Sequence, residues 1–345
     1  MNPMAQSILF LSLAIGTTIT LSGQHWLLAW IGLEINTLAI IPLMTKNFHP
    51  RAVEAATKYF LTQASASAII LFSCLYSAWQ SGEWSISLVT QPPITALSIA
   101  LMMKLGLAPM HFWLPDVLQG IPLTTGLILS SWQKIAPMAL LLQVSQHIDL
   151  SLITIIGLSS ILIGGWGGIS QTQVRKVMAF SSIGHLGWMV IILKFSPQLA
   201  LFNFILYIIM TTAMFFSLMA LSSPNLAQIS TSWAKTPALT SSMLLVLLSL
   251  AGLPPLTGFT PKLLISLELV KQNTILLMLT ITLASLLSLY FYLRLTYILT
   301  LMLPPNMPNA LVTWRNPVKT HFTTSTFNTL ALFTLPLAPA VTLLM

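Results

Sequence analysis

Long runs of apolar residues dominate this chain and limit what it can fold into. Stretches of about 20 residues with almost no charge follow one another along the chain, and such a stretch is long enough for a helix to cross a bilayer. Of the 345 residues, 56% are hydrophobic and only 6% are charged. A soluble domain carries about 25% charged residues. A soluble globular protein is therefore excluded.

We predict an all-α, polytopic membrane protein with about eleven transmembrane helices, forming a single transmembrane domain over residues 1–345. The turns between the helices are marked by Pro next to Asn, Gln or Ser. The expected helices are residues 3–22, 25–45, 54–80, 94–121, 123–145, 149–172, 177–195, 197–222, 238–271, 274–302 and 323–344. The expected turns contain Asn47 to Pro50, Gln91 to Pro93, Ser196-Pro197, Pro304-Pro305 and Asn316-Pro317.

Basic residues between the predicted helices indicate an orientation in the membrane. Loops on the inner side of a membrane carry an excess of Lys and Arg. The loops between the predicted helices are numbered from the N-terminus. The even-numbered loops hold seven basic residues: Lys46, Arg51, Arg175, Lys176, Lys235, Arg315 and Lys319. The odd-numbered loops hold only Lys194 and Lys271. We therefore expect the even loops and the N-terminus on the inner face, and the C-terminus on the opposite face.

Two proline-containing segments form an internal repeat. GLAPMHFWLPD (106–116) and GLPPLTGFTPK (252–262) align without a gap at a spacing of 146 residues. They lie in the fourth and ninth predicted helices, which run in opposite directions. The sequence thus predicts an inverted repeat with two discontinuous helices. Its halves are residues 1–145 and 149–302, followed by a C-terminal transmembrane helix at 323–344.

The prolines are expected to break both helices, because each lacks an N–H and clashes with the carbonyl four residues back. The breaks are assigned to Pro109, Pro115, Pro254, Pro255 and Pro261, and the carbonyls expected to lose helical partners are those of Leu105, His111, Ala251 and Thr257. A simple kink is the alternative interpretation. Paired broken helices in an inverted repeat instead indicate a transport site, since free backbone in a membrane is tolerated only inside protein or beside water.

Four charged residues lie far from any predicted loop: Glu34, Lys104, Lys134 and Lys262. An insertion scale assigns each a cost of about 2.5–3.5 kcal/mol at the centre of a helix. A Glu–Lys contact at about 4 Å contributes about 4 kcal/mol at an effective dielectric of about 20. Moving Glu34 toward or away from Lys104 would therefore switch whether the lysine keeps its proton. Lys134 and Lys262 would be the next groups of a proton relay.

The alternative is that these charges form structural buried pairs, and Lys262 could belong to a separate cluster with Glu268. His111 and His185 are expected within helices, as secondary relay candidates or as hydrogen-bonded packing residues. Asp116 is expected to cap the second half of its helix. Glu54 and Lys58, four residues apart, are expected to pair on a helix surface.

Other classes of function find no support in the sequence. The single cysteine, Cys74, excludes a disulfide framework, a cysteine-ligated iron–sulfur cluster and a structural zinc site. No phosphate-binding GxxxxGK[ST] loop is present. The GGWGG segment (164–168) predicts close helix packing rather than a dinucleotide site. The net charge is +8, but the basic residues are too scattered along the chain to indicate a nucleic-acid partner.

Three stretches carry a resemblance to a known family: WIGLEIN (30–36), KLGLAPMHFWLPDVLQG (104–120) and LSLAGLPPLTGFTPK (248–262). They resemble the subunit 2 family of vertebrate mitochondrial NADH–ubiquinone oxidoreductase, respiratory complex I. That family belongs to the antiporter-like membrane-arm subunits. Its motifs map onto Glu34 with Lys104, onto Lys134 and onto Lys262. The likeness covers essentially the whole chain, although larger antiporter-like subunits carry additional N-terminal helices.

The resemblance implies a membrane-arm subunit that contributes to proton translocation coupled to electron transfer from NADH to ubiquinone. It implies no cofactor and no metal on this chain, with flavin, iron–sulfur clusters and ubiquinone handled by other subunits. Expected partners are other membrane-arm and accessory subunits and membrane lipids, with cardiolipin as a candidate. The expected location is the mitochondrial inner membrane, with the N-terminus in the matrix and the C-terminus in the intermembrane space. A free-standing cation/proton antiporter and a purely structural membrane subunit are the alternatives.

Overall fold

The computed structural model describes residues 3–46, 49–86, 92–221, 225–226, 229, 232, 236–301 and 322–337. Within these ranges every regular element is a helix, as the apolar pattern predicts, and β-structure is limited to isolated bridges. The chain groups into two compact units, Met1–Ser160 and Ile161–Met345, with the division inside one helix. The predicted repeat halves remain a prediction, and each unit is described by itself.

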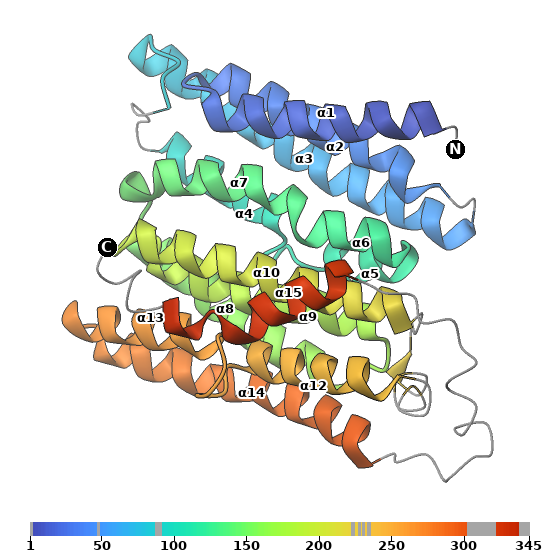
Figure 1. Ribbon diagram of the computed structural model, residues 1–345. Helices are drawn as coiled ribbons and strands as arrows, with labels where there is room; N and C mark the ends of the chain where they lie inside the picture. The colour runs from blue at the N-terminus through green and yellow to red at the C-terminus, as the bar shows by residue number, and fades with distance from the viewer. Residues whose placement is uncertain are drawn as a thin grey trace. The chain divides into compact units, whose positions relative to one another are not determined.

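The first unit is a bundle built on three adjoining helices, in which α2 lies between α1 and α3 (Figure 1). Helix α3 also contacts α4 and α5, and α7 packs on α1, α2, α4 and α6. The helices are α1 (Pro3–Ser22), α2 (Trp26–Met44), α3 (Pro50–Ser81), α4 (Pro93–Leu105), α5 (Trp113–Gly120), α6 (Leu123–Ser130) and α7 (Trp132–Val144), followed by the short η1 (Ser145–His147) and the start of α8 (Leu150–Ile169).

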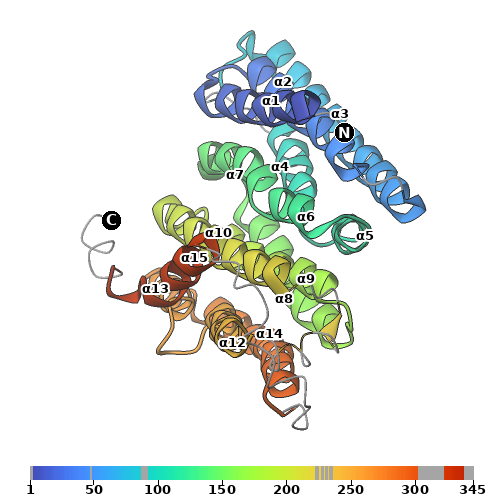
Figure 2. The ribbon, with the colours of Figure 1, turned by 45° about the vertical axis from the view of Figure 1, so that its right-hand side comes forward.

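The second unit is built around α10, which contacts α9, α12, α13 and α15; Figures 1 and 2 both show α15 lying beside α10. Helix α14 packs on α9, α12 and α13. The elements are the end of α8, then α9 (Val174–Ile192), α10 (Pro197–Leu221), α12 (Pro237–Ala251), α13 (Phe259–Lys271), α14 (Ile275–Leu301), α15 (Phe322–Phe333) and η4 (Leu335–Leu337).

The glycines of the GGWGG segment lie in α8 and allow close helix packing, as predicted. A Cβ on Gly164 would come within 2.7 Å of the backbone nitrogen of Gly184 in α9. A Cβ on Gly165 would come within 2.7 Å of Leu287 in α14, and one on Gly168 within 2.9 Å of Phe291. No side chain larger than hydrogen fits these contacts, so the small residues set the spacing of α8, α9 and α14.

Seven helical stretches among the described residues are long and apolar enough to span a membrane by themselves: Pro3–Ser22, Trp26–Met44, Pro50–Ser81, Leu123–His147, Leu150–Ile169, Pro197–Leu221 and Ile275–Thr300. The predicted helices at 94–121 and 238–271 are each divided into two shorter ones, at the breaks assigned to Pro109 and to Pro254 and Pro255. The breaks assigned to Pro115 and Pro261 are wrong, because both prolines lie in the first turn of a helix, α5 and α13, where the missing N–H has no intrahelical partner to lose. The carbonyls of His111 and Thr257 accept from the N–H groups of Leu114 and Thr260. The predicted helix at 177–195 corresponds to α9, and the one at 323–344 is described only as far as residue 337.

Several predicted features lie outside the described residues. These are the turns at Gln91, Pro304-Pro305 and Asn316-Pro317, part of the turn at Asn47, and the loop residues Lys235, Arg315 and Lys319.

The predicted continuous helix at 123–145 is wrong in one respect, because it is interrupted at Ser131. Both the backbone N–H and the side-chain hydroxyl of Ser131 donate to the Leu127 carbonyl, at 3.0 and 2.6 Å. A serine that bonds back to the preceding turn competes with regular helix geometry. Pro137 then withholds the N–H that would bond the Gln133 carbonyl. Lys134 therefore lies in the first turn of α7, rather than at the centre of a continuous helix.

Candidate functional site

Lys104 lies in the last turn of α4, directly before the first break. Its side chain is only 5% exposed. Gly106 ends the helix with φ +81°, and its N–H donates to the carbonyls of Met102 and Met103. That left-handed conformation suits glycine. The C-terminal end of a helix carries partial negative charge, so this position favours an ammonium group.

The unwound segment between α4 and α5 is held by its own side chains. The indole Nε1–H of Trp113 donates to the Met103 carbonyl at 3.3 Å. The Trp113 ring meets Tyr59 of α3 edge-on, with 5.7 Å between the ring centroids. Backbone that leaves the helix is thus partly satisfied inside the protein, as a break within a membrane requires.

Glu34 of α2 and Lys104 do not form a direct ion pair. Glu34 is partly buried, and both its Oε2 and the Lys104 Nζ are buried without a hydrogen-bond partner. A locked structural pair, the alternative left open by the sequence, is therefore not what this conformation contains.

Lys104 and Lys134 line the same internal cavity. Lys134 is 3% exposed. The cavity has a volume of about 20 Å³. Its wall consists of Leu33, Asn36, Thr37, Tyr59, Gln63, Lys104, Trp113, Leu129, Gln133, Lys134, Ala136 and Pro137, drawn from α2, α3, α4, α5, α6 and α7. The break after α4 and the break before α7 therefore bring two buried lysines to one small polar space.

Lys262 lies on α13, after the second break, and its side chain turns back onto that break. Its Nζ donates to the carbonyl of Ala251, the last residue of α12, at 2.7 Å. This carbonyl is one of those that the prolines were expected to free. Gly252, with φ +82°, makes the approach possible, since a Cβ there would lie 2.8 Å from the Lys262 Nζ. Glu268 pairs instead with Lys271, at 3.5 Å, which does not support a Lys262–Glu268 cluster.

The two histidines differ in their surroundings. His111 is buried in the unwound segment between α4 and α5, so the prediction that it lies within a helix is wrong. Its Nδ1 is 3.2 Å from the Pro109 carbonyl oxygen, close enough for a ring N–H to donate. His185 is buried within α9, as predicted, with its ring centroid 5.9 Å from that of Tyr207.

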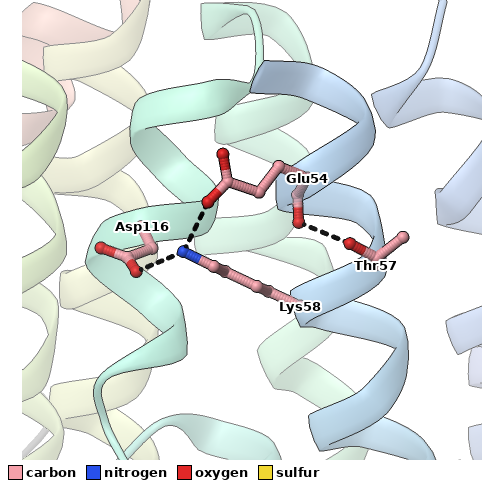
Figure 3. Close-up of polar contacts among 4 residues, drawn as sticks. All are labelled: Glu54, Thr57, Lys58 and Asp116. Carbon is pink, nitrogen blue, oxygen red and sulfur yellow. Dashed lines mark hydrogen bonds and ion pairs between the residues drawn. The ribbon is translucent and has the colours of Figure 1, made fainter. Parts of the chain in front are cut away.

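Asp116 does not cap α5, contrary to prediction. The residue before α5 is Phe112, and no side chain caps that helix. Asp116 lies one turn further on and binds Lys58 of α3, with Oδ2 2.9 Å from Nζ (Figure 3). Lys58 also binds Glu54 at 2.9 Å, which confirms the predicted helix-surface pair. This partly exposed cluster connects α3 to the second half of the broken helix.

Five neutral polar residues of the cavity wall were not predicted: Asn36, Thr37, Tyr59, Gln63 and Gln133. The amide Nε2 of Gln133 donates to the backbone carbonyl of Asn36 at 3.1 Å and so ties α7 to α2. Tyr59 and Gln63 are four residues apart on the buried face of α3. The sequence holds the corresponding signal, since uncharged polar side chains at helical spacing inside an apolar stretch tend to face the protein interior.

Within the described ranges no group of three or more His, Cys, Asp or Glu side chains could hold a metal ion.

Comparison with known families gives two matches that together span nearly the whole chain. Residues 23–288 match the transmembrane family described as NADH:quinone oxidoreductase/Mrp antiporter. Residues 289–342 match the C-terminal region of NADH dehydrogenase subunit 2.

Similar curated proteins have the same length. A protein of Aquarana catesbeiana named NADH-ubiquinone oxidoreductase chain 2 is 69% identical over 344 residues, covering 100% of both chains. Proteins of the same name from Xenopus laevis and Cyprinus carpio are 59% and 54% identical, covering 92% and 100% of this chain and 93% and 99% of theirs.

Solved structures with a similar fold come from bacterial and archaeal membrane complexes. Respiratory complex I from Thermus thermophilus with bound aureothin matches with a TM-score of 0.83 and 27% identity, over 98% of this chain and 80% of the other. The Mrp complex from Dietzia matches with a TM-score of 0.78 and 19% identity, over 83% and 59%. An archaeal membrane-bound sulfane sulfur reductase matches with a TM-score of 0.80 and 18% identity, over 97% and 74%.

Proposed function

Because this chain belongs to the NADH:quinone oxidoreductase/Mrp antiporter family, and within it to the subunit 2 proteins, we propose that it is a membrane-arm core subunit of respiratory complex I. In that complex it contributes to proton translocation coupled to electron transfer from NADH to ubiquinone. The family likeness expected from the sequence is confirmed by relatives that cover the full chain.

We further propose that Glu34, Lys104, Lys134 and Lys262 form a proton relay. The observation that carries this proposal is the shared cavity. It joins two buried lysines, and the Nζ of one of them, Lys104, has no hydrogen-bond partner. Charges that served only to hold helices together would be paired, because an unpaired buried charge is costly. Groups that exchange protons instead need a path for the proton between them, and a charged partner whose distance can change.

The control of the relay follows from the Glu34–Lys104 electrostatics. At an effective dielectric of about 20, the attraction is about 4 kcal/mol at 4 Å and about 2 kcal/mol at 8 Å. A movement of Glu34 over that range changes the attraction by about 2 kcal/mol, enough to change a protonation equilibrium roughly thirtyfold. When Glu34 approaches, Lys104 holds its proton; when Glu34 withdraws, the proton passes toward Lys134. Quinone chemistry elsewhere in the complex would supply the energy for this movement.

Lys262 is proposed as the receiving group in the second unit. Its bond to the Ala251 carbonyl places the ammonium at the negative end of α12. His111 and His185 are proposed as secondary proton carriers, His111 beside the first break and His185 on α9.

Electron transfer is assigned to other subunits of the complex, which would hold flavin, iron–sulfur clusters and ubiquinone, so this chain contributes no redox centre. Its proposed partners are the other membrane-arm and accessory subunits and the surrounding lipids, with cardiolipin as a candidate. The proposed location is the mitochondrial inner membrane, with the N-terminus in the matrix and the C-terminus in the intermembrane space.

The test is Lys134→Met in the complete complex. We expect normal assembly, with several-fold fewer protons pumped per NADH oxidised, measured in vesicles containing the purified complex. Lys46→Met is the matched control, because Lys46 is exposed and is not part of the cavity wall. Unchanged pumping in a fully assembled Lys134→Met complex would show that Lys134 is not part of the relay.

The free-standing antiporter is the second candidate, favoured only by the likeness in fold to the Mrp complex. It predicts Na⁺/H⁺ exchange by the purified chain alone in proteoliposomes, whereas the complex I subunit should show none. A purely structural subunit predicts that Lys104→Met and Glu34→Gln impair assembly while Lys134→Met leaves pumping intact.

A further inference from the structure

Unpartnered polar atoms collect around the cavity between Lys104 and Lys134. The Gln63 Nε2, the Lys104 Nζ and both amide atoms of Asn36 are buried without a hydrogen-bond partner, and all three residues line this cavity. Gln63 is only 4% exposed. Buried polar atoms in proteins are almost always hydrogen-bonded, to protein or to an ordered water. Several such atoms around one cavity therefore indicate that the cavity binds a small polar molecule such as water.

The dimensions and chemistry of the cavity fit a single water molecule. Its volume is about 20 Å³, and a polar cavity of about 10–15 Å³ or more, measured in the same way, can hold one water. A bound water also needs two to four polar partners. The Gln63 amide and the two lysines supply them. Tyr59 and Trp113, the largest side chains of the cavity wall, contact each other edge-on.

We propose that Gln63 is a positioning residue that holds one water molecule between Lys104 and Lys134, and that this water carries the proton from one lysine to the other. The inference rests on the proposed relay function and adds to it a residue and a route. Gln63 suits the role because it is uncharged. It orients the water without competing for the proton.

The transfer step conserves atoms and charge. The Lys104 ammonium and the Gln63 Nε2–H both donate to the oxygen of the water, and the water donates one O–H to the neutral amine of Lys134. An N–H bond of Lys104 then breaks as its proton bonds to the water oxygen, and the donated O–H breaks as its proton bonds to the Lys134 nitrogen. Lys104 becomes neutral, Lys134 becomes an ammonium and the water is restored.

Two substitutions test the proposal from different sides in the assembled complex. Gln63→Leu keeps much of the side-chain size and removes the amide. Ala136→Val adds two methyl groups at a buried cavity-wall position and reduces the space while Gln63 stays intact. Ala139→Val, on the same helix but not in the cavity wall, is the matched control. We expect both test variants to pump several-fold fewer protons per NADH, with normal assembly and unchanged KM for ubiquinone.

A high-resolution structure of the wild-type complex should show a water within hydrogen-bonding distance of the Gln63 Nε2 and the Lys104 Nζ, and the Gln63→Leu complex should lack it. Wild-type pumping in both variants, or no water at this position in the wild type, would overturn the proposal. If Gln63→Leu fails to assemble, Ala136→Val and the wild-type structure decide. Loss of pumping in Lys134→Met combined with normal pumping in both variants would leave the relay standing and remove Gln63 from it.

Discussion

The two broken helices start from nearly the same backbone geometry and then diverge. Each first half ends at a glycine with positive φ, +81° at Gly106 and +82° at Gly252, and the prolines that follow keep the same spacing. In each break a side chain from the second half returns to a carbonyl at the end of the first. Trp113 bonds the Met103 carbonyl, and Lys262 bonds the Ala251 carbonyl.

The difference lies in where the charge is placed. Asp116 and Lys262 occupy the same position of the repeat, yet Asp116 binds Lys58 at a half-exposed surface while Lys262 turns into the break. At the first break the buried lysine is Lys104, which lies in the helix before the break. Its Nζ has no hydrogen-bond partner. The second break holds its ammonium in a direct hydrogen bond. Two breaks with similar backbone geometry thus hold one buried lysine without a direct hydrogen-bond partner and one in a direct hydrogen bond to backbone.

The largest difference between the two breaks is expected from substitutions at Gly258 in the second break and Phe112 in the first. These two residues occupy equivalent positions in the repeat. A Cβ on Gly258 would overlap the Ser249 carbonyl oxygen, which is backbone and cannot move aside cheaply. Phe112 is 74% exposed. We expect Gly258→Ala to abolish or severely reduce the yield of assembled complex, measured by native gel electrophoresis.

Phe112→Ala is the matched control and should assemble at nearly wild-type yield. Equal yields from both variants would show that the second break is no more tightly packed than the first.

An intermediate effect is expected at the two helix-ending glycines. Alanine at either position meets the cost of a left-handed conformation, about 1 kcal/mol. Gly252→Ala should cost about 1 kcal/mol more, because its Cβ displaces the Lys262 ammonium from the Ala251 carbonyl. In Gly106→Ala the new Cβ would meet a Trp113 ring carbon at 3.2 Å, a contact that a small ring movement relieves.

Thermal unfolding of the assembled complexes measures this difference. With Lys262→Met as background, the extra cost of Gly252→Ala should disappear. If the extra cost persists in that background, the Lys262 contact is not its cause.

The smallest effect is expected at the ion cluster that distinguishes the first break. Lys58 and Asp116 have side chains 42% and 47% exposed, and exposed pairs contribute about 0–1 kcal/mol. Asp116→Asn should therefore lower the unfolding temperature only slightly, and less at high salt, because salt screens exposed charges. Glu54→Gln is the control for the pair within α3. A large loss of pumping in Asp116→Asn would mean that the cluster belongs to the relay.

The sequence by itself determined the class of fold and the position of the breaks. Runs of apolar residues can bury their backbone in a membrane only as helices, and Pro and Gly act on the backbone within a few residues of their own position. For the same reason the burial of Lys104 and Lys134 and the freed Ala251 carbonyl followed from the sequence, as did the close packing around the glycines at 164–168.

Only the tertiary structure decided which side chains meet. The cavity takes its wall from six helices, so no local pattern identifies Gln63 or Gln133 as its members. The helix is interrupted at Ser131, where the sequence has neither Gly nor Pro to mark a break. Asp116 accepts a hydrogen bond from Lys58, 58 residues away in the sequence, and does not cap the N-terminus of α5. Contacts between distant segments depend on how helices pack, and packing is a property of the whole unit rather than of any one stretch of sequence.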